Sequence, residues 1–476
     1  MKRLLIITYY WPPTGGSGVQ RWVKFSKYLP EFGWQPVIYT PENPEQLAVD
    51  ESLLADIPAC AEIIKTPIRE PYDVWRKLTG GKPGAGEVNP VNARKKSWKQ
   101  RLALWVRGNC FIPDPRAGWV RPSLRYLERY LREHPVDAVV TTGPPQSMHL
   151  IGLGLKKALG LPWIADFRDP WTEMFYYKHL GLTRASDRRH HRLEQAVLDG
   201  ADTVVSVSPP VAADFQAKTN TPVVLITNGF DEDDFADSGE IASGSNSSGG
   251  VPPEPPASRR SGFSDASAGD GQAERKLVFR QTCPENNSRP PVWKTPSPAR
   301  QGTSLRLVHT GLFAADGNPL NLWTVLGRRC EADPAFRERL QIRLAGKVDR
   351  AITDAIRDRG LGPNLVELGY LPHEQTVREQ READILLLPL RQEPEYAKVL
   401  PGKIFEYLAA GRPVLGIGQE DGAAAQILRD AGAGQMFDWD KTDALLAFLD
   451  AEHTRTAGIE KYSRRALTAQ LVKILP

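Results

Sequence analysis

The strongest constraint on the fold of this chain is a regular alternation of short apolar runs with segments of helical periodicity. Residues 3–8 form an apolar run, residues 19–32 carry an apolar helical face that ends at Gly33, and residues 36–40 form a second apolar run. The pattern continues with apolar runs at 136–142, 163–166, 203–207 and 223–227 and helical segments at 146–159 and 188–199. Because these strands are apolar throughout, they predict a parallel sheet with helices on both faces.

The alternation stops at residue 236 and resumes at residue 305. Of the 68 residues at 236–303, 28 are Ser, Pro or Gly and few are large and apolar, so we expect this segment to be disordered. Apolar runs then follow at 305–309, 341–345, 365–368, 385–390 and 413–416, with helical segments at 320–330 and 404–410. We therefore predict an α/β protein with two Rossmann-like, doubly wound domains at 1–235 and 304–476. The last helix is free to cross back to the first domain, and a cleft between two such domains is the usual place for an active site.

The charge and cysteine content exclude several functional classes. The 61 Lys and Arg residues nearly balance the 57 Asp and Glu residues, and a net charge of +4 does not indicate a nucleic-acid partner. The four cysteines form no CxxC pair and no zinc spacing, which is typical of a reducing cytoplasm. No apolar stretch approaches the ~18 residues that cross a bilayer. We expect a cytoplasmic protein, either soluble or peripheral on the inner face of the cell membrane.

The segment 401–415, Pro-Gly-Lys-Ile-Phe-Glu-Tyr-Leu-Ala-Ala-Gly-Arg-Pro-Val-Leu, is the most informative motif. A buried strand and a loop precede a helix that begins at Gly402, and unpaired amides in a first helical turn favour an anion such as a diphosphate. Gly402 lets a ligand approach the backbone, Lys403 adds a mobile charge, and Glu406 could accept hydrogen bonds from a ribose diol. From the residues alone, a capped amphipathic helix with a solvated Lys and Glu is an equally good interpretation.

Two further loops follow strands of the first domain. In Tyr-Tyr-Trp-Pro-Pro-Thr-Gly-Gly-Ser-Gly at 9–18, the amides of Gly15 and Gly16 could cradle a phosphate, although the loop has neither GxGxxG nor a P-loop lysine. In Asp-Phe-Arg-Asp-Pro-Trp at 166–171, Asp169 lies beyond the C-terminal end of a strand, where doubly wound sheets bind ligands. A flexible turn and a structural Arg–Asp pair are the alternative interpretations of these two loops.

One acidic and one histidine cluster are weaker candidates for metal ligation. Asp231 and Asp233 form an Asp-x-Asp pair after a turn sequence, and we interpret them as a solvated acidic turn. His190 and His191 are adjacent and point to different faces of a helix, so we place them at the surface rather than in a metal site.

The mild net charge hides a basic segment. Residues 69–132 contain 15 Lys and Arg against 5 Asp and Glu, a balance of +10. If residues 94–107 are helical, their spacing places Trp98, Leu102 and Trp105 on one face with basic residues beside it. This composition is typical of an interfacial helix on an anionic membrane. The predicted contacts are Lys95, Lys96, Trp98, Arg101 and Trp105. A helix packed on its own domain with solvated charges is the alternative.

Together these motifs resemble glycosyltransferase family 4, which has the GT-B fold. The stretch 401–415 resembles the Glu-containing donor motif of that family, and the strand and glycine loop at 3–18 resemble the start of its N-terminal domain. Asn-Gly-Phe-Asp at 228–231 is similar to the turn that ends that domain, and Leu-Val-His-Thr-Gly at 307–311 resembles the first strand of the donor domain. Thr-Gly-Pro-Pro-Gln-Ser at 142–147 and the motif at 166–171 resemble a bacterial subgroup linked to surface-polysaccharide assembly.

The resemblance implies a retaining glycosyltransferase that moves a sugar from a nucleotide-sugar donor to a glycan or lipid-linked acceptor, with no cofactor and no metal. It implies that Glu406 binds the donor ribose and that Gly311, Gly402 and Lys403 lie near the nucleotide diphosphate. On the acceptor side, it implies that the glycine loop at 15–16 shapes the cleft near the phosphates. Asp169 then lies near the transferred sugar, as a catalytic candidate beside Lys403.

The sequence departs from this family in two places. The family often has a second Glu eight residues before the donor Glu, where this chain has Lys398, and the basic pair that usually follows the first donor-domain strand is absent after Gly311. Lys347, Arg391, Lys398 or Lys403 could replace that charge. These departures keep two alternatives open. One is a catalytically degenerate sugar-nucleotide-binding or scaffold protein of a polysaccharide assembly complex, and the other is a GT-B nucleotide-sugar epimerase.

Overall fold

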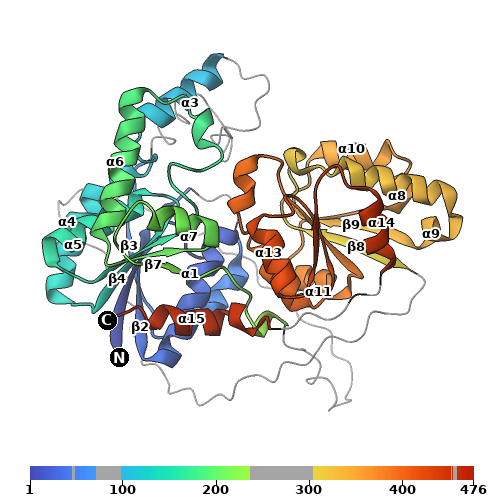
Figure 1. Ribbon diagram of the computed structural model, residues 1–476. Helices are drawn as coiled ribbons and strands as arrows, with labels where there is room; N and C mark the ends of the chain where they lie inside the picture. The colour runs from blue at the N-terminus through green and yellow to red at the C-terminus, as the bar shows by residue number, and fades with distance from the viewer. Residues whose placement is uncertain (46–48, 71–97, 236–303, 452, 454–457) are drawn as a thin grey trace, which may run out of the picture.

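Two parallel sheets, each covered by helices, form the protein (Figure 1). The computed structural model describes residues 1–45, 49–70, 98–235, 304–451, 453 and 458–476. The predicted disordered segment at 236–303 lies outside the described residues. The prediction of an α/β chain with two Rossmann-like domains is confirmed.

The N-terminal domain contains a seven-stranded sheet in the order β3-β2-β1-β4-β5-β6-β7. Its strands are β1 (Lys2–Ile7), β2 (Trp34–Pro41), β3 (Glu62–Thr66), β4 (Ala138–Gly143), β5 (Trp163–Phe167), β6 (Thr203–Ser206) and β7 (Val223–Leu225). Its described helices are α1 (Ser17–Tyr28), α3 (Trp98–Cys110), α4 (Ala117–Glu133), α5 (Ser147–Leu159), α6 (Arg184–Gly200) and α7 (Pro209–Gln216). The apolar run Leu4–Ile7 has no exposed surface, because helices cover the central strand on both faces.

The C-terminal domain contains a six-stranded parallel sheet in the order β10-β9-β8-β11-β12-β13. Its strands are β8 (Leu305–Thr310), β9 (Leu340–Ala345), β10 (Leu365–Gly369), β11 (Ile385–Pro389), β12 (Val414–Ile417) and β13 (Gly434–Phe437). The helices around it are α8 (Leu320–Ala332), α9 (Pro334–Arg339), α10 (Arg350–Arg357), α11 (His373–Glu382), α12 (Lys403–Ala410), α13 (Ala423–Asp430) and α14 (Asp443–Asp450).

In both sheets the order of strands reverses beside the first strand of the domain. One such switch point lies between β1 and β4, and the other lies between β8 and β11. Loops that leave the carboxyl ends of neighbouring strands in opposite directions open a crevice there, which is where doubly wound sheets bind ligands. The fold therefore provides one candidate crevice in each domain.

The last helix, α15 (Arg464–Val472), returns to the N-terminal domain and packs against α1 (Figure 1). Leu467 and Leu471 are buried in the core of that domain. Arg465 forms an ion pair with Glu31 at 3.0 Å, and the carbonyl of Pro476 accepts a hydrogen bond from Lys2 Nζ at 2.6 Å. The N-terminal domain is thus completed by the other end of the chain.

Candidate functional site

The donor motif lies at the switch point of the C-terminal sheet. Helix α12 follows the loop after β11, and Gly402 precedes its first residue, Lys403. The helix ends at Gly411, whose φ of 65° is a left-handed conformation that glycine adopts without strain. Gly311, directly after β8, lies beside the start of this helix, because a Cβ added to it would come within 3.3 Å of Lys403 Nζ. The structure therefore brings Gly311, Gly402 and Lys403 together at one sheet edge.

Lys403 is held at this edge by uncharged groups. Its Nζ donates to the carbonyls of Thr310 at 2.8 Å and Leu312 at 3.3 Å, and it lies 3.4 Å from His309 Nε2. Burial lowers the pKa of Lys403 to about 8, although the nearby charge of Glu406 raises it. Burial and the charge of Lys403 also keep the pKa of His309 well below its usual value, so this imidazole is neutral. An ammonium at a strand end that forms no ion pair with any described carboxylate is a favourable partner for an anionic ligand.

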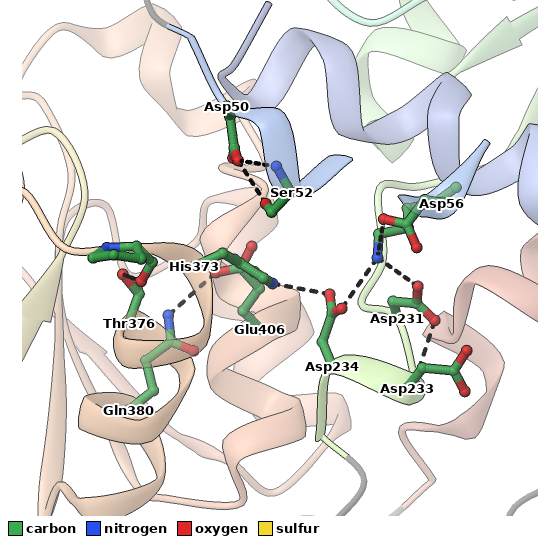
Figure 2. Close-up of polar contacts among 12 residues, drawn as sticks. Asp50, Ser52, Asp56, Asp231, Asp233, Asp234, His373, Thr376, Gln380 and Glu406 are labelled. Carbon is green, nitrogen blue, oxygen red and sulfur yellow. Dashed lines mark hydrogen bonds and ion pairs between the residues drawn. The ribbon is translucent and has the colours of Figure 1, made fainter. Parts of the chain in front are cut away.

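Glu406 lies one turn further along α12 and is oriented from α11. Gln380 Nε2 donates to Glu406 Oε2 at 3.1 Å and to Thr310 Oγ1 at 3.0 Å, and Gln380 is fully buried. Figure 2 shows His373, at the start of α11, close to this carboxylate and bonded to Asp234 of the other domain. One oxygen of Glu406 thus remains available to accept from a diol.

The other basic residues proposed to replace the missing pair are placed differently. Arg391 forms an ion pair with Asp316 at 2.7 Å, and Lys398 forms an ion pair with Asp214 of the N-terminal domain. The side chain of Lys347 is exposed, on the loop after β9 that contacts Gly311 through Gly346. Of these candidates, Lys403 combines partial burial with the absence of a carboxylate within ion-pair distance among the described residues.

The glycine loop after β1 is shaped by two different requirements. Gly15 packs against the 49–50 segment, since a Cβ there would lie 2.9 Å from Asp50 Cβ. Gly16 precedes α1 with a φ of 106°, and a Cβ added to it would meet no atom within 4 Å. Gly15 is therefore required for packing, whereas Gly16 presents an open backbone surface at the start of α1.

Asp166 and Asp169 in the motif after β5 have separate roles. Asp166 is buried and binds Arg21 at 2.9 Å. Although burial favours its neutral form, Arg21 and two further hydrogen bonds hold the pKa of Asp166 below its usual value. The predicted structural Arg–Asp pair exists, but its arginine comes from α1 instead of from the motif.

Asp169 faces the C-terminal domain. Burial raises its pKa, although the charge of Arg168 opposes this shift. Asp169 lines a small interdomain cavity of about 40 Å³ with Glu173, Ser208 and Lys398, and Lys403 is not among the residues that line it. Arg168 donates to the carbonyl of Gly18 at 2.8 Å and so ties this loop to the start of α1.

Two interpretations from sequence are wrong because residues distant in the chain pack on them. Asp231 is 2% exposed and not solvated, because Lys24 and Lys27 of α1 bind it at 2.6 and 2.8 Å. His190 is 3% exposed and not at the surface, because Trp171 Nε1 donates to its Nδ1 at 3.2 Å. His191, as predicted, is exposed. No group of three or more His, Cys, Asp or Glu in the described part of the chain is arranged to hold a metal ion.

The predicted amphipathic helix is present as α3. Lys95 and Lys96 lie outside the described residues, and the side chain of Trp98 is likewise not described. Arg101 is exposed, and Leu102 and Trp105 are 50% and 44% exposed. Among the described helices, none is both long and apolar enough to cross a membrane.

A second cavity, of about 340 Å³, lies at the switch point of the N-terminal sheet. Tyr10 follows β1, Gln146 follows β4, and Trp171 and Tyr176 follow β5, and all four line this cavity. Arg107, on α3, also lines this cavity. Arg107 and Gln380 belong to no recognisable sequence motif, so the sequence analysis did not identify them. Their positions near the two sites depend on how α3 and α11 pack.

The fold and its two strand-end crevices define a two-domain protein of the GT-B type. Residues 16–234 match the family model described as Glycosyltransferase Family 4, and residues 329–450 match the model described as Glycosyl transferases group 1. The chain therefore belongs to the glycosyltransferases, with a family 4 N-terminal domain and a group 1 C-terminal domain. No curated protein sequence shows significant similarity to the chain.

Solved structures share this fold over nearly the whole chain. Sucrose-phosphate synthase from Thermosynechococcus elongatus has a TM-score of 0.56 at 13% identity, covering 100% of this chain and 98% of its own. The UDP-forming α,α-trehalose-phosphate synthase from Burkholderia xenovorans has a TM-score of 0.54 at 10% identity and covers 99% of both chains. The lipopolysaccharide outer core galactosyltransferase WaaB has a TM-score of 0.52 at 11% identity, covering 99% of this chain and 98% of its own. At these identities the likeness establishes the GT-B fold.

Proposed function

We propose that this glycosyltransferase moves a sugar, with retention of configuration, from a nucleotide-sugar donor in the C-terminal domain to a glycan or lipid-linked acceptor in the N-terminal domain. The observation that carries the proposal is the position of Lys403. Its ammonium lies beside Gly311 at the β8–β11 switch point, with carbonyls and a neutral imidazole as partners. The departing diphosphate gains negative charge in the transition state, so a cation fixed at this point stabilises the transition state more than the ground state.

The remaining donor contacts follow from the same sheet edge. We propose that the backbone at the start of α12, which no side chain caps, and the backbone of Gly311 accept the diphosphate, and that Glu406 binds the ribose hydroxyls. Gly16 presents an open backbone toward the phosphates, while Gly15 fixes the loop. Because the ammonium and the helix amides supply positive charge, we propose that no metal takes part.

Asp169 is the candidate group near the transferred sugar. Its raised pKa follows from burial, and it faces residues of the C-terminal domain across a cavity too small for a hexose. We therefore propose that the domains separate on this side when the donor enters. The contacts that must open include the ion pair between Lys178 and Glu395 at 2.7 Å and the pair between Lys398 and Asp214.

Helix α3 suggests where the enzyme works. The exposed Leu102 and Trp105 lie on the helix of the basic segment, which supports peripheral attachment to an anionic membrane from the cytoplasmic side. Together with the motifs at 142–147 and 166–171, this supports a role in the assembly of a cell-surface polysaccharide.

A thermal-shift screen over nucleotide sugars tests the donor proposal, because a ligand that binds only the folded state raises the unfolding temperature. The donor that gives the largest shift is then incubated with and without a lipid-linked glycan, and the products are identified by NMR. Transfer with the donor configuration retained supports the proposal. An isomerised sugar formed from the donor alone would instead identify an epimerase, and an inverted product would contradict retention.

Sedimentation with vesicles tests the membrane proposal. We expect binding to phosphatidylcholine vesicles that contain phosphatidylglycerol, and we expect it to fall as salt rises. Trp105→Ser should weaken this binding, whereas the control Tyr370→Ser, at a 73% exposed aromatic of the other domain, should not. Equal binding of both variants and the wild type would contradict the role of α3.

A further inference from the structure

The cavity of the N-terminal domain has the composition of a site for an amphipathic, negatively charged ligand. It lies where the loops after β1 and β4 diverge, which is the ligand-binding crevice of a doubly wound sheet. Four of its lining side chains are large aromatic residues: Tyr10, Trp171, Tyr176 and Tyr177. Aromatic faces bind the apolar faces of sugar rings and of hydrocarbon chains and exclude water from the polar groups around them.

The charged side chains of the cavity are engaged elsewhere, with one exception. Asp114 accepts hydrogen bonds from the backbone and hydroxyl of Ser147, at 2.8 and 2.9 Å, and therefore holds the start of α5. Arg116 binds the buried Glu70 at 2.7 Å. Burial lowers the pKa of His190, so its ring is neutral. Arg107 has no hydrogen bond or ion pair with any residue in the part of the chain that the structure describes.

Arg107 is nevertheless fixed in position by the helix that carries it. The carboxyl end of α3 packs tightly on the segment before α6, since a Cβ on Gly108 would lie 2.7 Å from Leu182 Cδ2. Asn109 accepts from the amide of Thr183 at 2.7 Å and so ties the helix to the same segment. The guanidinium is thus presented to the cavity from an anchored element, as a phosphate or carboxylate site requires.

The same helix also offers an apolar surface. Leu102 and Trp105, which precede Arg107 by five and two residues, are 50% and 44% exposed, and Figure 1 shows α3 at the outer end of the domain, beside one end of α6. Residues two and five apart point to different sides of a helix, so this apolar face can contact a lipid surface while Arg107 lines the cavity. Among anionic ligands, this favours a lipid phosphate over a soluble sugar acid.

We propose that this cavity binds the acceptor, and that Arg107 recognises a phosphate or diphosphate group through which the acceptor is linked to its lipid. This inference rests on the proposed transferase function and names the acceptor class for it. The aromatic side chains would hold the sugar that is to be extended.

Isothermal titration calorimetry separates the contribution of the ligand's phosphate charge to the affinity from that of its hydrocarbon chain. The full-length protein is first saturated with the nucleoside diphosphate found in the donor screen, so that the donor site is occupied. Farnesyl diphosphate, farnesol and inorganic pyrophosphate are then titrated into the wild type, Arg107→Gln and Arg107→Lys. Arg125→Gln, an exposed arginine on α4, is the matched control.

We expect farnesyl diphosphate to bind the wild type and farnesol to bind it at least tenfold more weakly. Arg107→Gln should lower the affinity for farnesyl diphosphate by about tenfold to hundredfold, the scale of a charge-assisted hydrogen bond. Arg107→Lys should recover part of this affinity, and Arg125→Gln should match the wild type. Pyrophosphate that binds as tightly as farnesyl diphosphate, with the same dependence on Arg107, would support the phosphate site and assign it to soluble phosphates.

The inference is overturned if Arg107→Gln binds farnesyl diphosphate as the wild type does, or if farnesol binds equally well. It is also overturned if Arg107→Gln loses nucleoside diphosphate affinity to the same extent, because the arginine would then act on the fold as a whole. A wild type that binds no nucleoside diphosphate would contradict the donor proposal instead, and this is measured in the first titration.

Discussion

Replacing Lys403 by methionine tests the donor site most directly. Methionine keeps the length and the apolar stem of the side chain and removes the charge. In the free protein, holding the ammonium at this position lowers its pKa from 10.5 to about 8, which corresponds to about 3 kcal/mol against the charged form. A diphosphate that restores the ordinary pKa recovers about that amount. This agrees with the 10²- to 10³-fold loss seen when one electrostatic contact is removed from a transition state.

We therefore expect Lys403→Met to lower kcat by at least about 10² and to weaken binding of the nucleoside diphosphate product. The free protein loses the Lys403 proton as pH rises through about 8, whereas the bound diphosphate holds that proton to higher pH. Binding should thus weaken by up to tenfold per pH unit above pH 8, and Lys403→Arg should remove this dependence because arginine stays charged. The phosphate itself does not titrate there, since its second pKa is about 6.

Calorimetric titration at pH 7, 8 and 9 measures the affinity, and initial transfer rates measure kcat. Lys441→Met, which removes an exposed lysine of the same domain, is the matched control and should match the wild type. Lys403→Met with a rate and an affinity within about threefold of the wild type would refute the assignment. So would a pH dependence that persists in Lys403→Arg.

Three further outcomes follow from the contacts around this site. Asp231→Asn should lower the free energy of unfolding in urea by about 1.5–3 kcal/mol, because Lys24 and Lys27 each lose one of three carboxylate partners, whereas Asp233→Asn, with a half-exposed side chain, should change it little. Glu406→Gln should weaken the nucleoside diphosphate about tenfold in calorimetry while leaving pyrophosphate unchanged, because only the ribose contact is lost; equal weakening of both ligands would contradict this role. His373→Gln should destabilise the protein most below pH 6.5, because the hydrogen bond to its aspartate partner raises the pKa of His373, and this contribution disappears as pH rises through the raised value. A stability difference between His373→Gln and the wild type that does not change from pH 6 to 9 would contradict it.

The sequence predicted the two sheets well because their strands carry a local signal. Runs such as Leu4–Ile7 are apolar at every position, and a strand buried on both faces needs that composition. The donor helix was likewise predictable, since Gly402 and Gly411 mark its ends. The helix α3 was predicted from its apolar spacing, whereas the exposure of Leu102 and Trp105 on it is seen only in the structure.

The sequence failed where a residue's surroundings come from a distant part of the chain. Asp231 was interpreted as solvated because it follows a turn sequence and precedes the segment predicted to be disordered, yet its partners are lysines some 200 residues earlier, on α1. His190 was placed at the surface because its helix is highly charged, yet the loop containing Trp171 covers that face. No periodic pattern marks Gln380, which is buried and bonded to Glu406.

The sequence by itself thus determined the class of fold, the two domains and the residues at the strand ends, because backbone periodicity and glycine positions are local properties. The tertiary structure decided which of the basic residues has a charge that no carboxylate partner among the described residues neutralises. Of the basic side chains that could serve the donor, Arg391 and Lys398 are paired with carboxylates, whereas Lys403 is surrounded by carbonyls and an imidazole. The energy of a charge depends on its burial and its partners, and both are set only when distant segments pack together.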